Sequence, residues 1–265
     1  MKTLSKIALI AVGITYAITA NAQSCDKKGW QTIREDSIKV WKRSDNPAFF
    51  FKSKMTIDAD GSPRAYNPPN TGLDHICNAC ACNHNQPIKP WNCYGIVLVD
   101  GQPYIQGAND PAPGYYVSPT SLVDRTRTRN TDPRRYVDSE KIPYIALPPE
   151  VINQQCRPDG KACLGDIGFV LNTRNGRSAF VIVADQGPRN KIGEGSIALA
   201  RALDINSSPI NGGVNSASIL YLVFPKSGNG SPKSVQQINS AGSALLQSWG
   251  GQQRLEDCLN QHGGG

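Results

Sequence analysis

The sequence predicts a mainly β fold: a closed or nearly closed β-barrel with a few helices and disulfide-stabilised loops. Three observations support this prediction. The hydrophobic segments are short, glycine and proline are frequent at 25 and 19 of 265 residues, and tight turns separate runs of β-forming residues. Strands spread in this way favour a closed sheet, because closure leaves no exposed edge to pair with other chains. The double-psi barrel is one form of such a sheet.

The strongest strand signals lie in the second half of the chain. Residues 167–173 and 178–184 are β-type runs on either side of Asn175-Gly176, and Asn-Gly is the best short-range hairpin signal. A second hairpin is predicted where residues 94–99 meet residues 103–106 across Asp100-Gly101. The remaining predictions are strands at 142–147 and 217–224, a helix at 196–203 and a helix at 235–249.

The first 22 residues are typical of a signal peptide. Lys2 and Lys6 flank the start of an apolar run that ends at Ile18, and Ala20-Asn21-Ala22 is a small-x-small cleavage site. The apolar run is shorter than the roughly 20 residues that a bilayer span needs. We therefore expect cleavage after Ala22 and a secreted, extracellular monomer without membrane contact, the periplasm being the alternative compartment.

Three segments are predicted after the cleavage site: a basic N-terminal extension at 23–54, a main domain at 55–226, and a linker, helix and tail at 227–265. The stretch 29–51 looks like a short helix or strand that packs on the main domain. The formal charge of +7 falls to +5 without Lys2 and Lys6. The extension holds eight Lys/Arg against four Asp/Glu, a net +4, whereas the main domain holds 16 against 15.

The basic extension has two interpretations. It could hold the protein near an anionic surface, or it could be an ordinary solvated segment. A nearly neutral main domain without a nucleic-acid motif argues against nucleic acid as a partner.

All eight cysteines follow the predicted cleavage site, and an even number in an exported protein predicts disulfides. The sequence leaves their pairing open. Cys156 with Cys163 would close a small loop, and Cys25 with Cys258 would tie the two termini. The other four thiols, with two neighbouring imidazoles, would also suit a structural zinc ion; these residues are Cys77, Cys80, Cys82, Cys93, His75 and His84. We expect disulfides there, because exported cysteines usually oxidise, and no metal or cofactor.

Two carboxyl side chains follow the second strand of the Asn-Gly hairpin. Asp185 ends an apolar strand, where a side chain lies at the rim of a sheet, and Glu194 lies between two glycines in the loop that follows. Nine residues can fold back so that the two carboxyls face each other across a cleft, as glycoside hydrolysis requires. The alternative is structural: Asp185 caps a turn, and Glu194 places its charge near the start of the next helix.

Seven blocks of sequence follow one another between residues 55 and 225. They are Ile57-Asp-Ala-Asp-Gly-Ser-Pro-Arg-Ala-Tyr66, residues 106–118, 132–138, 142–148 and 171–179, then Ala184-Asp-Gln-Gly-Pro188 and residues 192–200. In this order they resemble the fungal-type chitosanases of glycoside hydrolase family 75. The resemblance implies a chitosanase-like catalytic domain at 55–226 that acts on chitosan or partly acetylated chitosan without a cofactor.

The resemblance also implies roles for the two carboxyls. The essential Asp and Glu of the family's Asp-x-Gly-Pro and Gly-Glu-Gly-Ser motifs fall on Asp185 and Glu194. The family is taken to invert, which implies an endo-enzyme for β-1,4 glucosamine linkages with Glu194 as general acid and Asp185 as general base. Inversion predicts carboxyls roughly 6.5 to 9.5 Å apart. To act near neutral pH, Glu194 needs a raised pKa.

A glycan-binding surface is predicted from acidic, amide and aromatic side chains: Asp58, Asp60, Asn109, Asp110, Tyr115 and Tyr116. Aromatic rings stack on sugar faces, and acidic subsites favour a polyamine such as chitosan. The alternative is that residues 109–114 form a plain turn and the tyrosines belong to the core. We expect Arg134, Arg135, Tyr136 and Asp138 to serve in structural ion pairing.

The segment 75–93, the basic extension and the C-terminal helix depart from the family pattern, so substrate preference could have changed with them. Two alternative functions therefore stay open. One is a peptidoglycan-directed glycosidase or lytic transglycosylase on a related barrel. The other is a glycan-binding barrel without catalysis.

Overall fold

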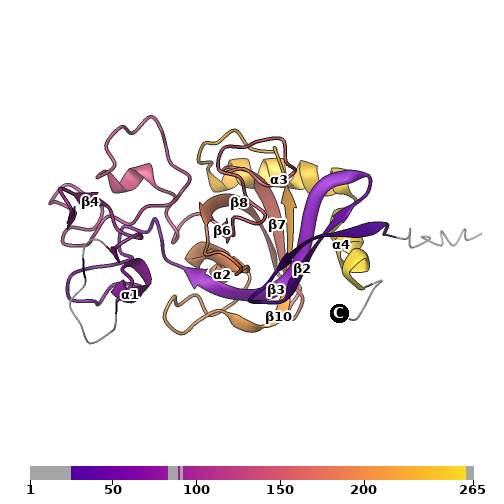
Figure 1. Cartoon of the computed structure of the whole chain (residues 1–265), viewed down its shortest axis with the longest axis horizontal. Helices are drawn as coiled ribbons and strands as arrows, with labels where there is room; N and C mark the ends of the chain where they lie inside the picture. The colour runs from indigo at the N-terminus through magenta and orange to yellow at the C-terminus, as the bar shows by residue number, and fades with distance from the viewer. Residues whose placement is uncertain (1–24, 83–88, 90–91, 261–265) are drawn as a thin grey trace, which may run out of the picture.

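A computed structural model describes residues 25–82, 89 and 92–260 (Figure 1). The predicted signal peptide lies outside these residues and is not tested by them. Within the described ranges, no helix is long and apolar enough to cross a membrane.

Six strands close into a β-barrel, which confirms the predicted fold class. Around the barrel the order is β3, β10, β7, β8, β6 and β9, and β9 pairs again with β3. The pairs β6–β8 and β3–β9 are parallel and the other four are antiparallel. The barrel strands are β3 (Asn46–Asp58), β6 (Tyr144–Leu147), β7 (Ile167–Asn172), β8 (Ser178–Gln186), β9 (Glu194–Ser196) and β10 (Val214–Phe224).

Both predicted hairpins are present. β7 and β8 pair antiparallel around a turn in which Gly176 has φ +74°. The second hairpin, β4 (Leu98–Val99) with β5 (Gln102–Pro103), is shorter than predicted. Asp100 and Gly101 between its strands have φ values of 49° and 74°. Positive φ at both central residues is what a tight two-residue hairpin turn requires.

Side chains of the barrel strands alternate between two apolar regions. Phe49 and Phe51 point into the barrel, where the ring of Phe51 stacks on that of Tyr221 at 4.7 Å between centroids. Phe50 points outward and meets Trp249 at the end of α3 (Val235–Trp249). Figure 1 shows α3 lying along the barrel. The sheet is therefore buried on both faces where α3 covers it.

The other helices are short, and three of them flank the barrel or its connections: α1 (Ile76–Ala79), α2 (Ile197–Ala202) and α4 (Gly251–Asn260). The helices α2 and α3 confirm the two predicted helices, whereas α4 lies in the predicted tail. Ser196 caps α2 by accepting a hydrogen bond from Leu199 N at 3.1 Å.

The N-terminal extension continues the barrel sheet. β1 (Lys27–Ile33) and β2 (Ile38–Arg43) form a hairpin, and β2 pairs with β3. β3 runs across the domain boundary predicted between Lys54 and Met55; that boundary stays a prediction. Part of the positive charge is engaged within the chain, because Lys42 Nζ lies 3.5 Å from the centroid of the Trp30 ring and donates to Gly160 O at 2.9 Å.

All eight cysteines form disulfides, as expected: Cys25–Cys258, Cys77–Cys82, Cys80–Cys93 and Cys156–Cys163. Two of these pairs are those considered from the sequence. The other two staple the segment around α1, so its four sulfur atoms are not available as thiolate ligands for zinc.

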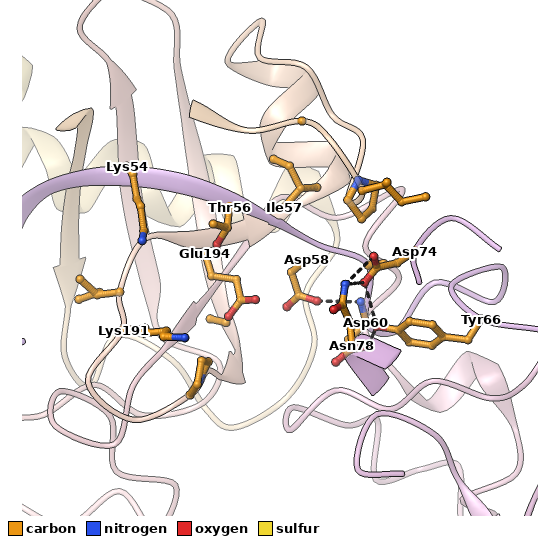
Figure 2. Close-up of a pocket in the computed structure, with 17 residues that line it drawn as sticks. Lys54, Thr56, Ile57, Asp58, Asp60, Tyr66, Asp74, Asn78, Lys191 and Glu194 are labelled. Atoms are coloured by element: carbon orange, nitrogen blue, oxygen red, sulfur yellow. Dashed lines mark hydrogen bonds between the residues drawn. The ribbon is translucent and has the colours of Figure 1, made fainter. Parts of the chain in front are cut away.

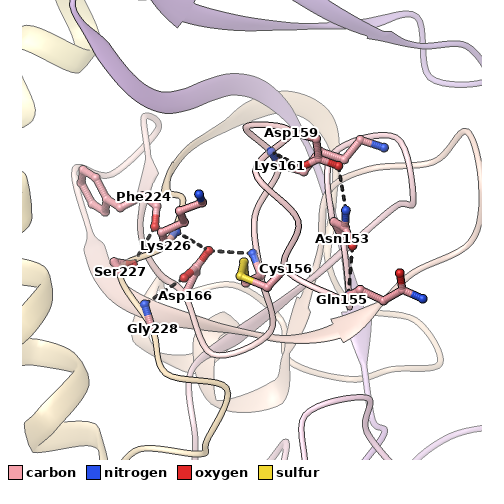
Figure 3. Close-up of a disulfide and its surroundings, with 11 residues drawn as sticks. Asn153, Gln155, Cys156, Asp159, Lys161, Asp166, Phe224, Lys226, Ser227 and Gly228 are labelled. Carbon is pink, nitrogen blue, oxygen red and sulfur yellow. Dashed lines mark hydrogen bonds between the residues drawn. A yellow bond between two sulfur atoms is a disulfide. The ribbon is translucent and has the colours of Figure 1, made fainter.

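Asp166 joins the disulfide loop to the chain that follows β10 (Figure 3). Its carboxyl is buried and accepts hydrogen bonds from the backbone N–H groups of Cys163 at 2.6 Å, Lys226 at 2.9 Å and Gly228 at 2.8 Å. Asp166→Ala would leave three donors unsatisfied, and each unsatisfied buried donor costs about 1 to 3 kcal/mol. We expect the free energy of unfolding to fall by about 3 kcal/mol or more in urea denaturation.

Asp159→Ala is the matched control for this prediction. Asp159 belongs to the loop closed by Cys156–Cys163 but is exposed, and it accepts hydrogen bonds from Lys161 N and Asn153 Nδ2. We expect this variant to unfold at nearly the urea concentration of the parent protein. Equal losses in the two variants would contradict the role of Asp166.

Candidate active site

Asp185 and Glu194 lie on either side of one residue of β6. Ala146 pairs with Asp185 at the end of β8 and with Glu194 at the start of β9. Neighbouring strands lie about 4.8 Å apart, so the two Cα atoms are separated by two strand spacings, roughly 10 Å. All three residues line one cavity. The sequence placed Glu194 in a loop, and its position in a short barrel strand fixes it more firmly.

The two carboxyls belong to a cleft made of two adjoining cavities of about 410 and 790 Å³. Asp185 lines the larger cavity, and Glu194 lines both. The other residues shared by the two cavities are Asp58, Asp60, Asn78, Ala146, Pro188 and Lys191. Figure 2 shows the smaller cavity, with Lys54 and Lys191 at one end, Glu194 between them and Asp58, and Asp60 and Asp74 at the other end.

Two glycines make room for Glu194. A Cβ atom on Gly187 would lie 3.0 Å from Glu194 Oε2, so the carboxyl rests over bare backbone. Gly193 has φ +100°, and a Cβ there would lie 2.4 Å from Lys54 O. Glycine adopts this conformation without strain and permits this approach. The glycines next to the two carboxyls therefore shape the cleft.

The carboxyl of Asp185 accepts three hydrogen bonds. Its Oδ1 accepts hydrogen bonds from Ser121 N at 3.0 Å, Ser121 Oγ at 2.5 Å and Gln186 N at 2.7 Å. Burial raises the pKa of Asp185, and these three hydrogen bonds oppose that rise. The hydrogen bonds therefore stabilise the ionised carboxylate, while burial keeps the pKa of Asp185 above its ordinary value.

The surroundings of Glu194 favour its protonated form. No described residue donates a hydrogen bond to its carboxyl. Burial, followed by the charges of Asp185 and Asp74, raises the pKa of Glu194 to about 7, while Lys191 opposes the rise. Two carboxyls whose environments separate their protonation behaviour can divide acid and base roles between them. The surroundings of the two carboxyls differ in this respect, because Asp185 accepts three hydrogen bonds and its pKa shift is opposed by them, whereas the pKa of Glu194 is raised to about 7.

Asp58 and Asp60, two of the predicted substrate-binding residues, lie at the end of β3 in the same cleft. Asp60 N donates to Asp58 Oδ1 at 2.8 Å, and Asp60 Oδ1 accepts from Tyr66 Oη at 3.0 Å and Ser118 Oγ at 2.9 Å. Burial and the neighbouring carboxylates raise the pKa of Asp58, and they raise that of Asp60 to about 8. Together with Asp74, the cleft thus holds five carboxyls, and they cannot all be ionised near neutral pH.

The other four predicted binding residues, Asn109, Asp110, Tyr115 and Tyr116, do not line either cavity. Asp110 accepts a hydrogen bond from Gly107 N at 2.9 Å and pairs with Arg134 at 3.8 Å, which shows the expected structural role for Arg134. Tyr116 is only 7% exposed. A role of these four residues in glycan binding stays a prediction.

Several residues of the cleft were not found from the sequence. Asn78 in α1 donates to both oxygens of Asp74 at 2.8 and 3.0 Å. Tyr94 lies on the rim of the larger cavity and is 81% exposed. Asn78 belongs to the disulfide-stapled segment, which departs from the family pattern, and Tyr94 follows that segment directly. Nothing in the sequence points to Ser121 as a partner of Asp185, because the two residues are 64 positions apart in the chain.

The part of the chain that the structure describes contains no group of three His, Cys, Asp or Glu side chains arranged to hold a metal ion.

Comparison with known families gives one match. A family model described as fungal chitosanase of glycosyl hydrolase group 75 matches residues 55–248. The match includes both central carboxyls, the last four residues of β3 and the other five barrel strands. It also extends past the predicted domain end at 226 into α3. No curated protein matches the chain.

Proposed function

This chain belongs to the fungal chitosanases of glycosyl hydrolase group 75, and from that premise we propose that it is a secreted endo-enzyme that hydrolyses β-1,4 glucosamine linkages with inversion. Membership of the family makes it a chitosanase-type glycoside hydrolase with a polysaccharide substrate. The observation that carries the finer proposal is the position of Asp185 and Glu194 on strands that flank Ala146.

In the proposed reaction the protonated Glu194 donates its proton to the glycosidic oxygen as the bond to the anomeric carbon breaks. Asp185 accepts a proton from a water molecule whose oxygen attacks that carbon from the opposite face. The proposal expects carboxyls roughly 6.5 to 9.5 Å apart, which leaves room for the water, whereas a retaining enzyme needs about 5 to 5.5 Å. The positions of Asp185 and Glu194 on two strands that flank β6 support it, because they place the two residues on opposite sides of Ala146. After each turnover Glu194 regains a proton from solvent and Asp185 loses one.

Asp58 and Asp60 would select the amino sugar. An ammonium group beside a buried carboxyl favours the ionised form of that carboxyl and gains a charge-assisted hydrogen bond. Asp58 is 8% exposed and both residues line the two cavities. The acidic end of the cleft therefore suits glucosamine better than its neutral acetylated form.

Two further features support endo action outside the cell. The two cavities adjoin through shared residues, so a long chain could cross the site without presenting an end. Four disulfides and this family fit an extracellular protein. We propose that the protein acts as a monomer.

The test is to incubate the mature protein with soluble chitosan and, separately, with peptidoglycan. Viscosity, new reducing ends and the first anomer formed, followed by NMR, should show rapid shortening of chitosan and initial release of the α-anomer. An initial β-anomer would overturn inversion. Anhydro-sugar products from peptidoglycan would favour a lytic transglycosylase, and tight binding without cleavage would favour a glycan-binding barrel.

Tyr94 provides a test of the disulfide-stapled segment. We expect Tyr94→Ala to raise KM for long chitosan oligosaccharides about fivefold and to change kcat less, because an apolar contact worth about 1 kcal/mol is lost. Tyr94→Trp is the matched variant and should keep KM near that of the parent. If Tyr94→Ala left KM unchanged, Tyr94 would not bind the sugar chain.

A further inference from the structure

The turn between β1 and β2 lies against the segment that leads to Glu194. Glu35 N donates to Asn190 O at 3.1 Å, and Ile192 N donates to Asp36 Oδ2 at 2.9 Å. These two contacts hold the backbone on both sides of Lys191, which lines both cavities. A turn from the N-terminal extension thus reaches the wall of the cleft.

Asp36 also connects this turn to β3. Its second oxygen, Oδ1, accepts a hydrogen bond from Lys54 Nζ at 2.7 Å, and its side chain is only 12% exposed. Lys54 lines the smaller cavity (Figure 2). Glu35 lies 3.5 Å from Lys191 in an exposed ion pair. The acidic pair in the turn therefore balances the two lysines at this end of the cleft.

The strand β3 holds the same segment from its other side. Ser53 Oγ donates to Ile192 O at 3.1 Å, and Thr56 N donates to Gly193 O at 2.8 Å. Residues 190–193 are consequently held between the turn and β3. Because Glu194 follows directly, the position of its carboxyl depends on both sides of this arrangement.

We propose that Asp36 is a positioning residue for the active site, which acts by fixing the backbone of residues 190–193 and the side chain of Lys54. The family match begins at residue 55, so neither the turn nor Lys54 falls within it. The inference rests on the proposed function only in treating Glu194 as the general acid. It makes the N-terminal hairpin a part of the catalytic unit.

The effect of Asp36 on Glu194 has a defined direction. The charged and titratable groups around Glu194 come from several elements. They are Asp185 on β8, Lys54 and Asp58 on β3, Asp60 just after β3, Tyr221 on β10, Asp74 before α1, and Lys191 on its own segment. Asp36→Asn can still accept from Ile192 N but leaves the charge of Lys54 unpaired. An added positive charge near the cleft favours the ionised form of Glu194 and so weakens it as an acid at neutral pH.

The experiment compares Asp36→Asn and Asp36→Ala with the parent in the full mature chain. The ¹³C carboxyl resonance of Glu194, assigned by its loss in Glu194→Gln, gives the titration midpoint without any substrate. We expect the midpoint to fall by about half a pH unit in Asp36→Asn. On chitosan, kcat at pH 7 should fall about threefold in Asp36→Asn and at least about tenfold in Asp36→Ala, with smaller changes in KM, because a displaced catalytic group slows the chemical step.

Asp45→Ala is the matched control. Asp45 lies in the turn between β2 and β3 and pairs with Arg43 in an exposed ion pair, away from residues 190–193. It should keep the parent's kcat and the parent's Glu194 titration. The inference is overturned if both Asp36 variants keep the parent's kcat and titration midpoint, or if Asp45→Ala changes them equally. If the parent does not cleave chitosan, the proposed function fails, and the titration still decides the inference.

Discussion

Glu194→Gln is expected to lower kcat on chitosan by about 10³-fold, because general acid catalysis contributes about 10² to 10⁴ and a glutamine side chain has no proton to donate. The change keeps the shape of the side chain over Gly187. It also removes one of five carboxyls that line the cleft, so the melting temperature should not fall. A variant that is folded but inactive would therefore report on chemistry.

The pH dependence of kcat/KM in the parent enzyme is a second test of Glu194 as the general acid. Burial and nearby carboxylates raise the pKa of Glu194 to about 7, and the acid must be protonated to act. The kcat/KM of the parent should therefore fall about tenfold per pH unit above pH 7. The residual kcat/KM of Glu194→Gln should not show this decrease above pH 7. Its only remaining pH dependence should come from titration of the substrate amines.

A substrate with a good leaving group tests whether Glu194 acts by protonating the leaving group or in another way. A glucosaminyl fluoride needs little protonation of its leaving group, so Glu194→Gln should hydrolyse it at a rate close to that of the parent. Asp138→Asn is the matched control and should keep full activity on both substrates, because Asp138 lines neither cavity and pairs with Lys141 at 2.8 Å. Parent-like cleavage of chitosan by Glu194→Gln would remove Glu194 from the mechanism.

Asp185→Asn is expected to lower kcat by a similar factor, about 10³-fold, because the attacking water loses its base. Here the fluoride should not restore activity, since the water still has to be activated. The side-chain amide introduced by this substitution keeps an oxygen that can accept from Ser121 N and Gln186 N, so the variant should fold. Rescue of Asp185→Asn by the fluoride would exchange the roles assigned to the two carboxyls.

Ser121→Ala is the milder variant of the same test. It removes the 2.5 Å hydrogen bond from Ser121 Oγ to Asp185 Oδ1. This bond favours the ionised carboxylate, so its loss raises the pKa of Asp185. The rise of kcat/KM from acidic pH, which reports ionisation of Asp185, should therefore move to higher pH. The decrease of kcat/KM above pH 7, which reports Glu194, should not move.

The sequence predicted the parts of the fold that depend on local signals. Asn175-Gly176 identified the β7–β8 hairpin, and the spacing of apolar residues from Val235 to Trp249 gave the bounds of α3. β9 was missed, because its three residues are held by pairing with β3 and β6, which are distant in the chain. The N-terminal hairpin stayed undecided between helix and strand, since its aromatic and charged residues follow no clear period.

In the candidate site, the residues that belong to sequence motifs were predicted and the residues that support them were not. Asp185, Glu194, Asp58 and Asp60 carry sequence motifs, and the barrel brings them into one cleft. Their supporting residues carry none. Asp36 is separated from Ile192 by 156 residues, and Ser121 reaches Asp185 from a different connection. Such contacts depend on closure of the sheet and on disulfides. Local sequence patterns do not show which distant segments these bring together.

The raised pKa of Asp60 links the folding of the cleft to proton binding. Asp60, with a pKa raised to about 8, holds a proton that it would lose at neutral pH in an unfolded chain. Its contribution to stability is complete below the ordinary carboxyl pKa near 4 and disappears as the pH rises through about 8. An ammonium group of the substrate beside Asp60 would displace this proton and take its place as the counter-ion. Substrate binding, proton release and the stability of the fold would then be one linked equilibrium.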